Sequence, residues 1–227
     1  MSTVLITGAN RGLGLEYARQ YADEGWRVIA TCRDPQNAIE LASLEGEIEI
    51  HELDICDHEQ ILSLANSLGK EAIDLLLNNA GIFDPRPSKL GDIDYNTWEE
   101  FMHINVMSPL MVCASFSDHV AASNLKKIAI MSSKMGSIDD NSSGGSYVYR
   151  STKAALNAVM KSLSVDLGPR DISVAILHPG WVRTDMGGPN GLIDAPESVN
   201  GLRQVIKDLN LKNSGRFYNY DGSEIPW

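Results

Sequence analysis

The sequence predicts an α/β protein in which helices cover both faces of a doubly wound parallel sheet of about seven strands. Short β-branched or aliphatic runs alternate with longer helical patterns along the whole chain, as expected for parallel strands joined by right-handed helical crossovers. Several runs are apolar at consecutive positions, which is typical of strands buried on both faces. The 227 residues, of which 43% are hydrophobic and 22% charged, suit one globular domain.

Most of the expected strands are short runs rich in valine, isoleucine and leucine, as in TVLIT near the start of the chain, whereas the last, RFYNY, is aromatic. The expected strands are 3–7, 27–32, 48–53, 74–79, 127–132, 173–178 and 216–220. The expected helices between them are 12–24, 35–45, 57–68, 96–121, 149–167 and 196–210. Two helices have an aspartate cap and a proline in the first turn: Asp34 with Pro35, and Asp194 with Pro196. The irregular stretches 80–95, 134–146 and 179–195 each follow a strand, where open α/β sheets bind ligands.

Composition excludes several classes of partner. The net charge is −11 and lysines and arginines form no run, which argues against nucleic acid and anionic membranes. The three cysteines are widely spaced without a CxxC pair, which favours free thiols in the cytoplasm over disulfides or a zinc site. The start of the chain lacks a charged region before its apolar run, so no signal peptide is expected. No apolar stretch approaches ~20 residues, and the histidines show no ligand spacing, so we expect neither a membrane span nor a metal.

A glycine-rich loop lies between the first expected strand and the first expected helix. Gly8 allows a sharp turn, Gly12 lets the backbone approach a pyrophosphate, and Gly14 lets the helix pack closely on the sheet. The helix N-terminus that follows offers free N–H groups and a partial positive charge to phosphates. The spacing is G-x-x-x-G-x-G, and its place after a strand and before a helix predicts a dinucleotide-binding loop.

The end of the second expected strand indicates which dinucleotide binds. Enzymes that bind NAD usually place a carboxylate there, whereas an arginine suits a 2′-phosphate. Cys32 occupies that position, Arg33 follows it, and Arg11 of the glycine loop could reach the same phosphate. These residues favour NADP(H). Asp34 is adjacent, so NAD(H) stays open.

One lysine stands close to two tyrosines in SYVYRSTK (residues 146–153). At about 100° per residue, Tyr149 and Lys153 differ by roughly 40° around a helix, whereas Tyr147 and Lys153 differ by roughly 240°. Only Tyr149 can place its hydroxyl beside the ammonium group. A nearby cation lowers the pKa of a phenol, so Tyr149 becomes a candidate general acid.

Six motifs resemble those of the short-chain dehydrogenase/reductase (SDR) family and occur in the family's order. They are TGANRGLG (7–14), NNAG (78–81), INVMSP with Asn105, MSSKMGS (131–137), YRSTK (149–153) and HPGWVRTDM (178–186). The resemblance covers essentially the whole chain. It implies a single Rossmann-fold domain, residues 1–227, with a cofactor half of about 1–125 and a catalytic half of about 126–227. The stretches GSYVYRSTKAALNAVMKSLSVDL and YNYDGSEIPW are most similar to the small carbonyl reductases of the sniffer and C-factor type.

The resemblance implies a catalytic tetrad. Tyr149 would protonate the carbonyl oxygen, while Lys153 would lower the Tyr149 pKa and hold the nicotinamide ribose. Ser133 would stabilise the developing charge on that oxygen, and Asn105 would hold a water that links Lys153 to solvent. The family's serine lies three residues before a glycine, which fits Ser133. Asn105 has the alternative role of breaking or capping a helix.

The resemblance also implies cofactor and substrate contacts. Asp54 would lie beside the adenine ring, with the alternative that it only caps the following helix. Trp181 would line the substrate pocket or merely pack, and Tyr147 would line the pocket mouth or pack at a helix start. The implied cofactor contacts are Gly8, Asn10, Arg11, Gly12, Leu13, Gly14, Arg33, Asp54, Ile55, Asn79, Ala80, Gly81, Tyr149, Lys153, Pro179, Gly180, Val182 and Thr184; the substrate contacts are Ser133, Tyr147 and Trp181.

These implied roles predict an NADPH-dependent reduction of an aldehyde or ketone to an alcohol by hydride transfer. The alternative is a signalling or developmental protein of the C-factor type, in which cofactor binding matters more than turnover. The partner would be a small carbonyl compound, and a homodimer or homotetramer is compatible with the family. The segment after WVRTDM is rich in glycine and proline, which predicts an open pocket, or one partly closed by loop 80–95 or by a partner subunit.

Overall fold

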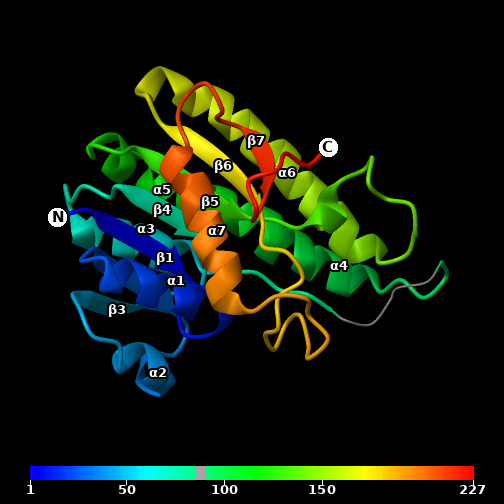
Figure 1. The fold of residues 1–227 in the computed structure, drawn as a ribbon, viewed down its shortest axis with the longest axis horizontal. Coiled ribbons are helices and arrows are strands. Elements are labelled where there is room, and N and C mark those ends of the chain that lie inside the picture. Colours follow the sequence, from blue (N-terminus) through cyan, green and yellow to red (C-terminus); the bar gives the residue numbers. More distant parts are fainter. Residues whose placement is uncertain (85–89) are drawn as a thin grey trace.

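A parallel sheet forms the centre of the computed structural model, which describes residues 1–84 and 90–227. Within these residues seven strands pair in the order β3-β2-β1-β4-β5-β6-β7 (Figure 1), which confirms the doubly wound α/β prediction. Three strands begin and end at the predicted residues, and the other four differ from their predicted bounds by one residue at one or both ends. The strands are β1 (Thr3–Thr7), β2 (Arg27–Cys32), β3 (Ile48–Glu52), β4 (Leu75–Asn78), β5 (Lys127–Met131), β6 (Ser173–His178) and β7 (Arg216–Asn219).

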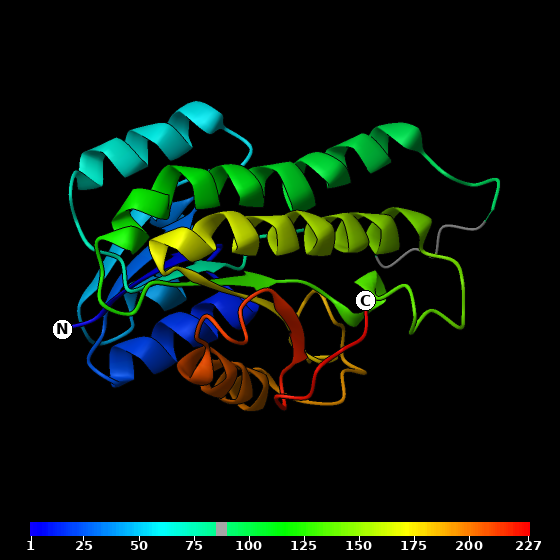
Figure 2. The same ribbon diagram turned by 90° about the horizontal axis from the view of Figure 1, so that it is seen from above.

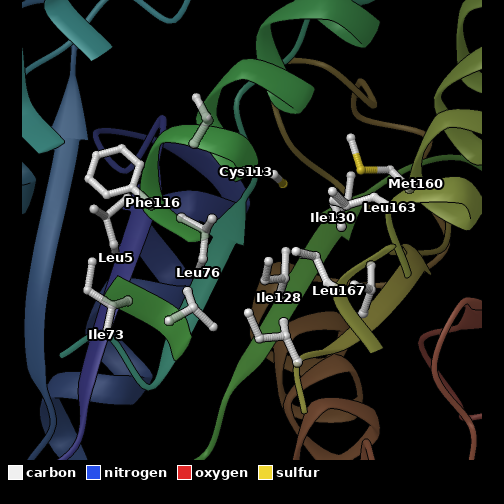
Figure 3. Packing of buried hydrophobic residues seen from close by; sticks show 14 of the residues in the cluster. Leu5, Ile73, Leu76, Cys113, Phe116, Ile128, Ile130, Met160, Leu163 and Leu167 are labelled. Carbon is white, nitrogen blue, oxygen red and sulfur yellow. The ribbon is translucent and has the colours of Figure 1, made fainter. Parts of the chain in front are cut away.

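Helices cover both faces of the sheet, as Figure 2 shows. On one face lie α3 (His58–Leu68), α5 (Ser108–Ala121) and α6 (Tyr147–Leu167), and on the other lie α1 (Gly12–Asp23) and α7 (Ala195–Asp208). Side chains alternate between the faces, so Leu5 of β1 packs against Phe116 of α5 (Figure 3), while Val4 and Ile6 pack on the opposite face. Two apolar layers explain why the strands read as continuous apolar runs.

The predicted helix 96–121 is wrong in its middle. The chain forms α4 (Tyr95–Met102), then a π-helix (His103–Met107), then α5. The π-helix contains Asn105, whose side chain bonds to the backbone of Ile82. Such insertions often lie at functional sites because they re-aim one residue without ending the helix.

The predicted helix 35–45 is also wrong. It is a 3₁₀ turn (Pro35–Asn37) followed by the single turn α2 (Ile39–Ala42). Asp34 does cap the turn, since its side chain accepts a hydrogen bond from the Asn37 backbone N–H at 3.2 Å. Only Ala38 and Leu41 are buried in this stretch, so it lacks the apolar stripe that would hold a longer helix against the sheet.

The carboxyl ends of β1, β4, β5 and β6 meet at one edge of the sheet because all neighbouring strands are parallel. The strand order reverses between β1 and β4, where doubly wound sheets bind their ligands. The motifs that follow these four strands are therefore brought together.

Along the described parts of the chain, no helix has both the length and the apolar character needed to cross a membrane.

Candidate active site

The glycine loop leaves β1 and enters α1 by two left-handed residues. The φ angles are +67° at Gly8 and +57° at Gly12, a region that favours glycine. Gly14 has another constraint, because a Cβ there would lie 2.1 Å from the Gly8 carbonyl oxygen. The first turn of α1 has no capping side chain, so its backbone N–H groups can bind an anion.

We expect Gly14→Ala to destabilise the protein by about 1–3 kcal/mol, since the added methyl overlaps backbone that cannot move away cheaply. Denaturant unfolding measures this change. Gly168→Ala is the matched control, because its φ is −53° and, apart from its neighbours in the chain, no atom lies within 4 Å of its Cβ position. Equal stability of the two variants would contradict the close approach of Gly14 to Gly8.

Asn79 and Thr7 join the ends of β4 and β1. The Asn79 amide donates to the carbonyl oxygens of Thr7 and Gly8, both at 3.0 Å. The Thr7 hydroxyl accepts from the backbone N–H groups of Asn79 and Ala80 at 3.0 and 3.1 Å. These four bonds fix the exit of β1, and the role of Thr7 was not predicted. Its signal was a hydroxyl at the end of an apolar strand, directly before a glycine.

Lys153 and Tyr149 lie one helical turn apart on α6 and face the carboxyl end of β5. Lys153 is 6% exposed, and its Nζ donates to the Met131 carbonyl oxygen at 3.0 Å. The same Nζ lies 5.8 Å from the Tyr149 ring centroid. Tyr147 at the start of α6 is 38% exposed, so the structure pairs Tyr149, and not Tyr147, with the lysine.

Ser133, and not its neighbour Ser132, meets Tyr149. The Ser132 hydroxyl donates to Asn157 Oδ1 at 2.5 Å in the interior. The Ser133 hydroxyl lies close enough to Tyr149 to lower the pKa of the phenol, and it accepts from the Met135 N–H at 3.2 Å. Because the Met135 bond uses an acceptor position, the Ser133 hydrogen is available to donate.

Asn105 is 1% exposed and is held by two bonds to Ile82. Its Oδ1 accepts from the Ile82 N–H at 2.9 Å, and its Nδ2 donates to the Ile82 carbonyl oxygen at 3.0 Å. A Cβ on Gly81 would lie 3.0 Å from Asn105 Oδ1 and 3.8 Å from Lys153 Nζ. Asn105 and Lys153 therefore flank the same glycine, and a side chain at this position would crowd the Asn105 amide oxygen.

Burial is the main cause of the pKa shifts of Tyr149 and Lys153. It raises the pKa of Tyr149 to about 12, partly offset by the hydrogen bond with Ser133, and it lowers the pKa of Lys153 to about 8. The Lys153 Nζ is directed to the Met131 carbonyl oxygen, and the predicted lowering of the Tyr149 pKa by Lys153 stays a prediction. At neutral pH the phenol is protonated and most of the ammonium is charged.

The segment after β6 is held by its own hydrogen bonds, although it contains little regular structure. Trp181 is 51% exposed, and its indole N–H donates to the Gly187 carbonyl oxygen at 2.7 Å. Val182 pairs with Ile193 in an isolated bridge, and the Thr184 hydroxyl accepts from the Gly187 N–H at 3.2 Å. A Cβ on Gly12 would be 3.9 Å from the Thr184 methyl carbon, so this segment faces the glycine loop.

Pro179 and Gly180 begin that segment. The Pro179 carbonyl oxygen accepts from the Ser198 hydroxyl at 2.6 Å. Gly180 has a φ of +80°, and a Cβ there would lie 2.7 Å from the Ile193 Cδ1. The sharp turn after β6 therefore requires glycine.

Two of the predicted cofactor contacts, Arg33 and Asp54, lie just after β2 and β3. Arg33 is exposed, and its positive charge acts on Cys56 of the segment after β3. Arg11 pairs with Asp185 at 3.4 Å, an exposed contact of small energy. The Asp54 carboxylate accepts from the Cys56 N–H at 2.9 Å. Asp57 caps α3, so the alternative of Asp54 as the helix cap is wrong.

The remaining predicted contacts lie along the same edge. Asn10 is exposed at the loop tip, and Leu13 packs on the core beneath it. Ile55 is buried in the core on the α3 face.

A cavity of about 240 Å³ opens beside Tyr149. Its described lining comprises Asp84, Asp92, Asp94, Thr97, Phe101, Ser146, Val148 and Tyr149, and it therefore does not include Tyr147 or Trp181. Loop 80–95 was one of the alternatives for partly closing the pocket, and its residues 85–89 lie outside the described residues. Phe83, which was not predicted, packs edge-on against Tyr149 with ring centroids 4.8 Å apart. No sequence motif around Phe83 indicates that its ring contacts Tyr149 of α6.

The site can hold a dinucleotide and transfer a proton. Glycines fill the positions where a Cβ would block the loop, and the half-buried Tyr149 phenol lies beside a serine donor and a lysine. In the parts of the chain that the structure describes, no three His, Cys, Asp or Glu side chains are grouped to bind a metal ion.

Several known proteins are similar to this chain in sequence and fold. A family model described as short chain dehydrogenase matches residues 2–191. C-signal of Myxococcus xanthus is 44% identical over 155 residues, which are 68% of this chain and 93% of that protein. The carbonyl reductase Sniffer of D. melanogaster has a TM-score of 0.92 and 35% identity over 100% of both chains. An NADPH-bound carbonyl reductase from chicken fatty liver has a TM-score of 0.92 and 33% identity, covering 100% of this chain and 99% of its own.

Proposed function

The chain belongs to the short chain dehydrogenase family of oxidoreductases, and from this premise we propose that it reduces an aldehyde or ketone to an alcohol with NADPH. The observation that carries the proposal is the grouping of Tyr149, Ser133 and Lys153 at the sheet edge that also bears the glycine loop. Carbonyl reductases of similar fold support the reaction class.

The residues at this edge fit a dinucleotide. Gly8, Gly12 and the first turn of α1 would hold the pyrophosphate, and Lys153 would hold the nicotinamide ribose. Pro179 and Gly180 would shape the nicotinamide side, and the Val182 backbone and the Thr184 hydroxyl would meet the carboxamide and the phosphates. NADPH supplies the hydride when it is bound.

Tyr149 would donate the proton to the carbonyl oxygen. Its raised pKa keeps the phenol protonated at neutral pH, which is the form that a general acid needs. Ser133 would donate a hydrogen bond to the same oxygen and so stabilise its developing charge. Phe83 packs on the ring of Tyr149 and limits the orientations that the phenol can take.

The preference for NADPH over NADH rests on Arg33. The neighbouring Asp34 carboxylate is occupied by the backbone N–H and the amide of Asn37, at 3.2 and 2.6 Å. It is therefore less available to ribose hydroxyls, whereas Arg33 is exposed at the end of β2. NADP is also bound in a similar carbonyl reductase from Pseudomonas aeruginosa PAO1, which has a TM-score of 0.87 and 31% identity.

We expect Arg33→Ala to weaken NADPH binding roughly 10- to 100-fold and to leave NADH binding unchanged, because only the 2′-phosphate needs the guanidinium. Fluorescence titration of both cofactors measures the two constants. Arg216→Ala is the control, since Arg216 lies at the amino end of β7 and pairs with Glu224 at 3.0 Å. An equal loss for NADH and NADPH would show that Arg33 does not read the phosphate.

The reaction itself is tested by NADPH and NADH oxidation with a panel of aldehydes, quinones, diketones and keto-steroids. Oxidation that depends on a carbonyl compound and on Tyr149 supports the proposal. Tight NADPH binding without turnover of any panel member would contradict it.

A second candidate function is favoured by one observation, the 44% identity with C-signal. In that case cofactor binding would matter more than turnover, and the protein would act in signalling or development. The panel above separates the two, because a binding protein should hold NADPH and reduce none of the compounds.

We also propose a cytoplasmic location. Cys32, Cys56 and Cys113 are all free thiols, and two of them are buried. Free cysteines are typical of proteins from a reducing compartment.

A further inference from the structure

The segment of residues 223–227, here called the strap, runs back along the outer edge of β7. Glu224 forms an antiparallel bridge with Tyr218, and the Ile225 N–H donates to the Phe217 carbonyl oxygen at 2.8 Å. Ile225 is buried in the core. The strap is thus fixed to the last strand of the sheet and runs antiparallel to it. Its end, marked C in Figure 2, lies beside the turn that follows β5.

Trp227 is held at both its ring and its backbone. The ring stacks on Phe217 with centroids 5.9 Å apart and an interplanar angle of 17°. The Trp227 backbone oxygen accepts from the N–H groups of Ile138 and Asp139 at 2.6 and 2.9 Å, and from the Ser137 hydroxyl at 3.2 Å. Three donors from one turn therefore meet at this position.

The turn that binds Trp227 leads directly from Ser133. It begins with the 3₁₀ helix η3 (Lys134–Gly136), whose backbone lies against α6. A Cβ on Gly136 would lie 2.7 Å from the Lys153 carbonyl carbon, and the Asn157 amide donates to the Gly136 carbonyl oxygen at 3.4 Å. Ser137, which is 2% exposed, follows at once and bonds to Trp227. The segment from Ser133 to Ser137 is thus enclosed between α6 and the strap.

We propose that Trp227 is a positioning residue for Ser133. This inference rests on the proposed function. Helix α6 carries Tyr149 and Lys153 and supports one side of the Ser133 turn, and the strap supports the other side. Without the strap, the turn can move away from α6, and the Ser133 hydroxyl loses its alignment with Tyr149. A displacement of about 1 Å at a reacting group costs on the order of 10²-fold in rate, so the support affects turnover.

The first test is independent of turnover. Hydrogen exchange of peptides covering residues 133–140 should be about tenfold faster in Trp227→Ala, because without the ring stack on Phe217 the Trp227 backbone oxygen is held less firmly against the turn. The expected size corresponds to weakening those contacts by about one hydrogen bond. Trp227→Phe should keep the exchange of the unmodified protein, because phenylalanine can stack on Phe217. Leu211→Ala is the matched control, since Leu211 is 49% exposed and Trp227 is 45% exposed. Unchanged exchange in Trp227→Ala would overturn the proposal.

The second test locates the effect at Ser133. Trp227→Ala should lower kcat roughly tenfold with less than a twofold change in the NADPH Kd, and Trp227→Phe should restore kcat. In a Ser133→Ala background the same substitution should change kcat less than twofold, because the group that it positions is gone. Additive losses would mean that Trp227 acts elsewhere and would overturn the proposal. Absence of turnover in the unmodified protein would count against the proposed function, while the exchange measurement would still decide the role of the strap.

Discussion

Replacing Tyr149 with phenylalanine should lower carbonyl reduction roughly 10²- to 10⁴-fold, the range that a positioned general acid contributes. The substitution removes only the hydroxyl, whose pKa Ser133 influences, and keeps the ring that packs against Phe83. The NADPH Kd should change less than threefold, because the glycine loop and Lys153 remain in place. Steady-state rates and a fluorescence titration measure the two quantities.

Tyr147→Phe is the matched control for this prediction. It makes the same chemical change two residues away on α6, where the side chain is exposed and does not line the described part of the cavity at Tyr149. Its turnover should stay within about twofold of the unmodified protein, as expected for a surface substitution. A Tyr149→Phe variant that is as active as Tyr147→Phe would remove Tyr149 from the mechanism.

Replacing Lys153 with methionine should abolish most activity and yet stabilise the fold. Burial lowers the pKa of Lys153 from 10.5 to about 8, and keeping the charge at pH 7 therefore costs about 3 kcal/mol. The lost hydrogen bond to the Met131 carbonyl offsets about 1 kcal/mol of the gain. We expect Lys153→Met to be about 2 kcal/mol more stable at pH 7 by denaturant unfolding.

The stability difference should depend on pH. The folded protein releases the Lys153 proton near pH 8, whereas the unfolded chain keeps it to about 10.5. Between these values the unfolded chain binds more protons, so raising the pH stabilises the unmodified protein, and the advantage of Lys153→Met shrinks. Lys161→Met on the exposed face of α6 is the control and should change stability by less than about 0.5 kcal/mol at every pH.

The same pKa predicts the pH profile of turnover. The Lys153 charge declines as the pH rises through about 8, so kcat/KM of the unmodified protein should fall on that limb. Tyr149 stays protonated throughout this range because its pKa is about 12. The unfolding experiment can contradict this view of Lys153. If the stability difference between Lys153→Met and the unmodified protein widens between pH 8 and 10, the lysine is not held in a desolvated site.

Strand positions were predictable because they depend on local composition. The runs 3–7, 27–32 and 173–178 are apolar, bounded by turn residues, and match β1, β2 and β6. The helix 96–121 was predictable in extent but not in its interruption at Asn105. The partner of Asn105 is the backbone of Ile82, 23 residues earlier, and helical periodicity within 96–121 carries no information about that segment.

The chemical groups of the site were predictable to a similar degree. Glycine spacing indicated the phosphate loop, and helical periodicity selected Tyr149 over Tyr147 as the neighbour of Lys153. The choice of Ser133 over Ser132 came from the family resemblance alone. In the structure, Ser132 bonds to Asn157 of α6 while Ser133 lies near Tyr149 and lowers its pKa, a division that depends on how β5 and α6 pack.

The sequence by itself determined the α/β architecture, the family and which side chains share the reactive face of α6. Only the tertiary structure decided how far Tyr149 and Lys153 are desolvated on that face and which turn bonds to the Trp227 backbone. The physical reason is the same for both. Desolvation of Tyr149 and Lys153, and the bonds to the Trp227 backbone, depend on atoms from segments far apart along the chain.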